Sequence, residues 1–168
     1  MNRFRVVKYM AYSIEIILAL VWQSTPYILP EVFGGKAVLL LPLALTVAIF
    51  EPEVPAMIFA VVSGLLADCS YGGAIGYYAI MFIIMAFVVS NLNRSVLRTS
   101  LFTAMLEAVI AVPVIVFLQF LFYYVFAGYT DAGYFFFSHY LSRMLCTLAF
   151  VPVFYGLNYI LNKRLGRT

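Results

Sequence analysis

The chain has 168 residues, of which 65% are hydrophobic and only 10% are charged, far below the quarter of charged residues that is usual in soluble domains. This composition excludes an ordinary soluble fold and indicates an all-α integral membrane protein. The formal net charge of +3 is small, so a nucleic-acid partner is not indicated.

At about 20 residues a span, a chain of this length accommodates five to seven transmembrane helices and no second core. We expect one transmembrane domain over residues 1–168, built as a six-helix bundle. The six predicted spans are approximately 9–25, 37–50, 55–68, 74–91, 101–126 and 134–161.

The first apolar run follows Arg3, Arg5 and Lys8, a pattern shared by signal peptides and uncleaved first spans. Because no A-x-A cleavage pattern follows, we interpret it as a retained helix. The second and third segments are short, each giving roughly 20 Å of helix against a hydrocarbon core of roughly 30 Å. They therefore either thin the bilayer or form a re-entrant hairpin.

Asp68 stands between the third segment and a glycine-rich turn that contains Gly72 and Gly76. A carboxylate at the centre of a membrane costs roughly 2.5 to 3.5 kcal/mol even on mild insertion scales, so a partner must offset this cost. The glycines lack Cβ atoms, and backbone or a partner can approach them closely. This turn is the first candidate site.

Small residues recur at three- and four-residue spacing before Asp68 and put a small-residue face on the third helix. This face consists of Ala56, Ala60, Ser63, Gly64 and Ala67. Small faces let helices pack closely in lipid. The pattern is equally consistent with packing inside the chain and with a binding face for another protein.

Further ionisable residues lie within predicted spans. We hypothesise that Arg143 pairs with Asp68, because each alone would be an uncompensated charge; the alternatives are an Asp68 that is solvated and accepts N–H bonds in the turn, and an Arg143 that extends to lipid phosphates. Glu15 and Glu107 are expected at comparable depth. They either form a proton or cation site or, more commonly for such residues, bond to neighbouring polar groups.

The distribution of basic residues predicts the orientation. All Lys and Arg residues except Lys36 and Arg143 fall near span ends that this topology places on one side. Because the cytoplasmic side carries the excess of Lys and Arg, we expect both termini in the cytoplasm.

Nothing in the sequence resembles a catalytic constellation. There is one histidine, His139, and no Cys/His pair at ligand spacing or phosphate-binding glycine loop. We therefore expect no enzyme activity, no metal and no cofactor.

The acidic turn Glu51-Pro52, the run Gly64-Leu65-Leu66-Ala67-Asp68, and then Gly72 and Ile75-Gly76 resemble the MreD family of bacterial rod shape-determining proteins. The resemblance assigns weight to Gly64, Asp68, Gly72 and Gly76. The chain departs from the usual family pattern at Cys69-Ser70-Tyr71, where Leu or Phe and small residues are frequent, which leaves its partner preference open.

This resemblance implies a non-catalytic scaffold in the bacterial inner membrane that presents small faces to a partner's transmembrane helix. Implied partners are membrane lipid, an MreC-like bitopic protein, a glycosyltransferase–transpeptidase wall synthase and, indirectly, an MreB-like cytoskeleton. In its six-helix architecture the chain also resembles the substrate-binding subunits of energy-coupling-factor vitamin transporters. That alternative function requires a polar outer pocket formed by Arg143, His139, Asp68 and tyrosines.

Overall fold

The computed structural model describes residues 3–25, 36–71, 76–95, 99–125 and 136–165. These residues are all-helical, as the composition predicts. The six α-helices are α1 (Arg3–Ser24), α2 (Leu40–Phe50), α3 (Glu53–Tyr71), α4 (Tyr77–Ser95), α5 (Leu101–Phe120) and α7 (Leu141–Leu165), with short π-helical turns η1 (Leu121–Val125) and η2 (Phe136–Tyr140). Each predicted span overlaps one of these helices.

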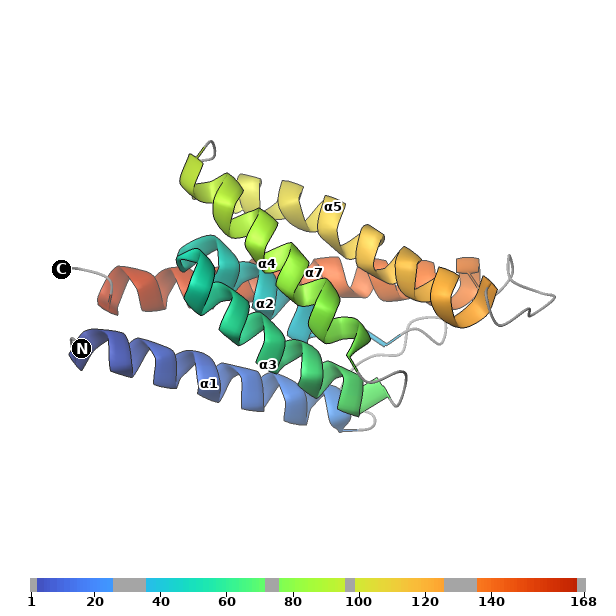
Figure 1. The fold of residues 1–168 in the computed structure, drawn as a ribbon, viewed down its shortest axis with the longest axis horizontal. Helices are drawn as coiled ribbons and strands as arrows, with labels where there is room; N and C mark the ends of the chain where they lie inside the picture. Colours follow the sequence, from blue (N-terminus) through green and yellow to red (C-terminus); the bar gives the residue numbers. More distant parts are fainter. Residues whose placement is uncertain (1–2, 26–35, 72–75, 96–98, 126–135, 166–168) are drawn as a thin grey trace.

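Helix α2 lies in the middle of an elongated bundle, surrounded by the longer helices (Figure 1). It packs against α1, α3, α4, α5 and α7, and all residues from Leu40 to Ile49 are buried. A helix that is apolar on every side suits such a position. With 11 residues it is only about 16 Å long.

Helix α3 is longer than the sequence predicts. It begins at Glu53 and continues through Asp68 to Tyr71, giving 19 residues. Of the described helices, α3, α4, α5 with its extension to Tyr123, and α7 are long and apolar enough to cross a membrane. Helix α2 is apolar but shorter, and α1, with its charged first turns, falls outside this set.

The outer faces of the long helices carry large exposed apolar side chains, among them Met10 of α1, Ile84 of α4, Ile110 of α5 and Leu145 of α7. Such an outward apolar surface suits lipid. The two ends of the chain lie at the same end of the bundle (Figure 1). We call this the terminal end, and the opposite end the turn end, because α3 ends and α4 begins there.

Candidate functional site

Gly64 of α3 lies in close contact with the backbone of α4. A Cβ atom built on Gly64 would lie 2.5 Å from the Ala79 Cα and 2.7 Å from the Tyr78 carbonyl oxygen, so no residue with a side chain fits without a backbone shift. The small-residue face of α3, which includes Ala60, is buried inside the chain. Of the two alternatives, packing inside the chain and a binding face for another protein, the structure has the packing inside the chain.

The side chain of Asp68, a residue of α3, caps the first turn of α4. Its carboxylate accepts N–H bonds from Gly76 and Tyr78, each at 2.9 Å, and from Ala79 at 3.4 Å. The first N–H groups of a helix have no partner within the helix, and the positive end of the helix dipole favours a carboxylate. The Asp68 side chain is buried, so the predicted N–H bonds are present but the predicted solvation is not.

Of the two turn glycines, Gly76 is described and Gly72 lies outside the described residues. The φ angle of Gly76 is +103°, a conformation that L-residues with a side chain rarely adopt. It turns the chain so that its own N–H group reaches Asp68.

Arg143 binds other groups than Asp68. Its Nη1 atom donates to Gln119 Oε1 at 3.0 Å, and its Nε atom donates to the Lys36 carbonyl oxygen at 3.3 Å. Its guanidinium lies 4.2 Å from the centre of the Tyr71 ring, a favourable cation–π arrangement. Within the described ranges there is no Asp68–Arg143 ion pair, and the side chain turns toward these internal partners rather than toward lipid phosphates.

These contacts belong to a larger set at the turn end that we call the Arg143 network. It consists of Lys36, Ala37, Tyr71, Tyr78, Gln119 and Arg143. The Tyr78 hydroxyl donates to Gln119 Oε1 at 2.7 Å, and the Tyr71 hydroxyl donates to the Ala37 carbonyl oxygen at 3.0 Å. The network therefore joins α3, α4, α5 and α7 to the segment that enters α2.

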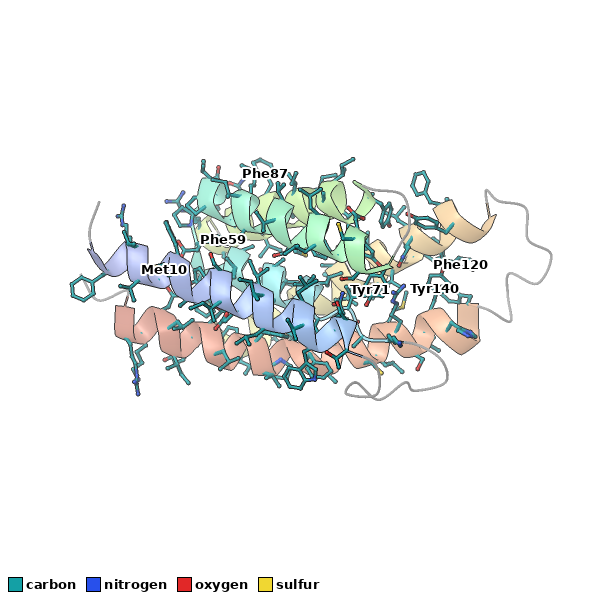
Figure 2. The ribbon with its side chains drawn as sticks, turned by 90° about the horizontal axis from the view of Figure 1, so that it is seen from below. Met10, Phe59, Tyr71, Phe87, Phe120 and Tyr140 are labelled. Atoms are coloured by element: carbon teal, nitrogen blue, oxygen red, sulfur yellow. The ribbon has the colours of Figure 1, made fainter. Side chains whose placement is uncertain are left out.

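A cavity of 210 Å³ adjoins the Arg143 network. It is lined by Asp68, Tyr71, Tyr78, Gln119, Tyr123 and Tyr140. Figure 2 shows Tyr71 and Tyr140 close to this end of the molecule. Ligand pockets usually measure about 300 to 1,000 Å³. The Asp68 carboxylate, the hydroxyls of Tyr71 and Tyr78, and the side-chain oxygen of Gln119 already bond to groups of the chain. His139 is exposed.

Side chains of the long helices also satisfy the backbone where it enters α2. The Val38 N–H donates to Thr147 Oγ1 at 3.1 Å, and the Leu40 N–H donates to Gln23 Oε1 at 3.4 Å. In lipid no water is present to bond to these groups. The short helix is stable within the bundle because α1 and α7 supply its partners.

At the terminal end, Glu51 follows α2 directly. Lys8 Nζ lies 2.5 Å from Glu51 Oε1, where the Glu51 side chain is buried and the Lys8 side chain is 12% exposed. Ser90 Oγ donates to the Glu51 carbonyl oxygen at 3.0 Å, and Asn162 Nδ2 donates to the Tyr12 hydroxyl at 2.9 Å. The first two contacts attach α1 and α4 to the end of α2, and the third joins α7 to α1.

Glu15 and Glu107 have separate surroundings and share no partner. Asn93 Nδ2 donates to Glu107 Oε1 at 2.7 Å, and Glu107 is buried between α4 and α5. Glu15 instead lines a groove beside α7. The structure does not bring these carboxylates together into one ion site, and no group of three metal-binding side chains exists among the residues that it describes.

The sequence reasoning missed Gln119 as a site residue. Gln119 accepts bonds from both Tyr78 and Arg143 and so connects three helices. A signal was available, because Gln119 is a polar residue near the end of the apolar run Leu101–Phe120, and polar residues inside spans usually face partners.

An all-helical chain with four helices long and apolar enough to span a bilayer and an apolar outer surface is a multi-pass membrane protein. Comparison with protein families matches residues 4–160 to the family described as rod shape-determining protein MreD. The chain therefore belongs to the MreD family and has a role in determining rod cell shape. No curated protein and no solved structure matched it, so nothing supports a likeness to vitamin-transporter subunits.

Proposed function

We propose that this protein is a non-catalytic membrane scaffold of the cell-wall elongation complex, required for rod shape and lateral peptidoglycan synthesis. The match to the MreD family over residues 4–160 carries this proposal. The structure is consistent with it, because the buried polar groups of the turn end bond mainly to one another while the outer faces carry apolar side chains. Such a molecule acts by contact with neighbours in the bilayer.

The proposed topology is one six-helix transmembrane domain over residues 1–168 in the bacterial inner membrane, with both termini in the cytoplasm. The chain ends lie at the same end of the bundle (Figure 1). Lys8 near the start of α1, Arg94 at the end of α4, and Lys163 and Arg164 at the end of α7 supply the positive charge expected on the cytoplasmic side. In this topology α2 is a short central helix enclosed by the other five.

The proposed partners are an MreC-like bitopic protein and a glycosyltransferase–transpeptidase wall synthase, with an MreB-like cytoskeleton reached indirectly. A partner's transmembrane helix would meet the exposed apolar faces of the peripheral helices. Gly64, Ala60 and Asp68 contribute indirectly, since they fix the α3–α4 hairpin. Arg143 and Glu107 likewise bond within the chain.

Depletion of the protein in a rod-shaped host, followed by microscopy, tests this function. We expect the cells to round up, and we expect a tagged copy isolated in mild detergent to carry the MreC-like protein with it. Cells that remain rods but require an added vitamin would overturn the scaffold proposal. A tightly bound vitamin in purified protein would have the same consequence.

A further inference from the structure

The α1–α7 side of the bundle carries an open groove of 470 Å³. Its lining residues are Glu15, Leu18, Ala19, Val21, Trp22, Thr25, Phe154 and Leu157. Leu18, Val21, Trp22 and Leu157 are exposed, whereas Ala19 is buried. The groove is therefore an apolar channel between two helices, with a small residue at its floor and large side chains at its edges.

Glu15 is the acidic residue of this groove. Its Oε2 atom is buried and has no hydrogen-bond partner among the described residues. Glu15 lies 12 residues after the start and 9 residues before the end of α1, or roughly 18 Å and 14 Å along the helix. In the proposed topology its carboxyl group is therefore near the middle of the bilayer.

A carboxyl group at this depth needs a hydrogen-bond partner. A buried polar group without a hydrogen-bond partner destabilises the structure, and a charged one does so more strongly. Acyl chains of lipid contain no donor, and lipid head groups lie at the surface of the bilayer. Another transmembrane helix with a polar side chain supplies both the donor and the apolar surface that the groove requires.

We propose that the α1–α7 groove binds one transmembrane helix of a partner protein, and that this helix presents an amide, hydroxyl or ammonium donor to Glu15. The inference rests on the proposed scaffold function and names the surface through which the scaffold holds its partner. The ring of Trp22 packs edge-on against Phe150, with 6.3 Å between ring centres, and gives the groove a fixed wall.

Glu107 provides the contrast that supports this choice. It also has one oxygen without a partner, Oε2, but its other oxygen accepts from Asn93 and the side chain is buried within the bundle. Glu15 makes no bond within the described chain and lines an open groove. Of the two carboxylates, only Glu15 is placed to meet a helix from outside.

Photo-crosslinking in intact membranes tests the groove directly. A benzoylphenylalanine residue replaces Leu18 in one variant and Ile110 of α5 in the other, two outward aliphatic side chains that are each 60% exposed. The full-length MreC-like bitopic protein of the same host is co-expressed as the probe. We expect its transmembrane segment to crosslink through position 18 and not through position 110.

The other outcomes separate the two proposals. Loss of any complex with the MreC-like protein would overturn the proposed function and the groove with it. An intact complex that crosslinks only through position 110 would overturn the groove alone. Crosslinks at position 18 exclusively to lipid or to a second copy of this chain would also overturn it.

Substitution of Glu15 tests the donor. An interhelical hydrogen bond in lipid contributes about 0.6 to 1.7 kcal/mol, so we expect Glu15→Leu to reduce co-purification of the MreC-like protein about threefold to eighteenfold. Glu15→Gln keeps an acceptor and should retain most binding. Leu18→Trp, which fills the groove, should reduce binding, whereas the matched Ile110→Trp should not.

The purified Glu15→Leu chain should unfold at the same temperature as the unsubstituted chain or at a higher one, because the substitution breaks no bond within the described structure and removes a buried oxygen without a partner. Binding of the Glu15→Leu and Leu18→Trp variants at unsubstituted levels would overturn the proposal.

Discussion

The α3–α4 hairpin and the α1–α7 pair are both contacts between two helices, but the first is closed within the chain and the second leaves an open groove. In the hairpin, Gly64 brings two backbones together and Asp68 satisfies the N–H groups of α4, so the contact is closed within the chain. Between α1 and α7, large side chains leave a groove, and Glu15 has no partner among the described residues. Helices in lipid have no hydrophobic drive to associate, so close fit and satisfied polar groups decide which contacts are internal.

Substitution of Lys8 tests whether its contact with Glu51 attaches α1 to the bundle. Replacing it in Lys8→Met leaves the buried Glu51 carboxylate without its cation, which should destabilise the protein by about 3 to 5 kcal/mol. The matched variant Lys163→Met removes an exposed charge and should have little effect. Thermal unfolding in detergent, followed by size-exclusion chromatography, measures both. Equal stability of the two variants would show that the Lys8–Glu51 contact does not attach α1.

Asp68 tests the polar half of the hairpin. Asp68→Leu leaves the N–H groups of Gly76, Tyr78 and Ala79 without their acceptor, and we expect a loss of about 3 kcal/mol. Asp68→Asn keeps one acceptor oxygen and should lose less. The same unfolding assay, with hydrogen exchange of the α4 amides, measures the change. Unaltered protection of these amides in Asp68→Leu would contradict the capping role.

Gly64 tests the steric half. Gly64→Ala puts a methyl group against the Ala79 backbone at 2.5 Å and should destabilise by about 1 to 3 kcal/mol. In α7 the matched Gly156→Ala places its methyl group in open space and should stabilise by up to about 1 kcal/mol, because Ala favours helix more than Gly. Unfolding temperatures that shift in the same direction for both variants would refute the close-contact explanation.

Double-mutant cycles sharpen the assignment of Arg143. Gln119 and Arg143 are in direct contact, so Gln119→Leu and Arg143→Met should show a coupling energy of about 0.5 kcal/mol or more. Asp68→Asn and Arg143→Met, which are connected only through Tyr78 and Gln119, should show a smaller coupling energy than this first pair. Strong coupling in the second cycle would indicate that Asp68 and Arg143 form an ion pair.

Leu18 should give the smallest effect. Leu18→Trp changes an exposed side chain on the open side of α1, and the free energy of unfolding should change by less than about 0.5 kcal/mol. A large loss of stability would show that the groove closes inside the chain. The unfolding assay used for Gly64→Ala provides the comparison.

The sequence predicted the helices but not their arrangement. Each apolar run of the sequence overlaps one of the six described α-helices, and the shortness of α2 was visible in its pattern. Its central position was not, because a helix that is apolar on all sides can face either lipid or protein in a membrane. For the same reason, the small residues around Gly64 indicated close packing without indicating what packs there.

Polar partners were the least predictable part of the site. Asp68 was identified by its charge, but its placement at the edge of a span made α3 appear shorter than its 19 residues. The carboxylate is tolerated inside the helix because the backbone of α4 solvates it. Arg143 finds Gln119 and Lys36, which lie 24 and 107 residues away in the chain, and no local pattern indicates such distant pairings.

The capping of α2 has a consequence for biosynthesis. The Thr147 hydroxyl that satisfies the Val38 N–H lies 109 residues downstream, so at about 5 to 20 residues per second it leaves the ribosome roughly 5 to 20 s after its partner. During that interval the Val38 N–H group of the nascent chain must form its hydrogen bond with water or with the insertion machinery. A chain that ends before α7 would therefore lack the Thr147 hydroxyl that bonds to the segment entering α2. Quality-control proteases would recognise such a chain as an incompletely folded membrane protein.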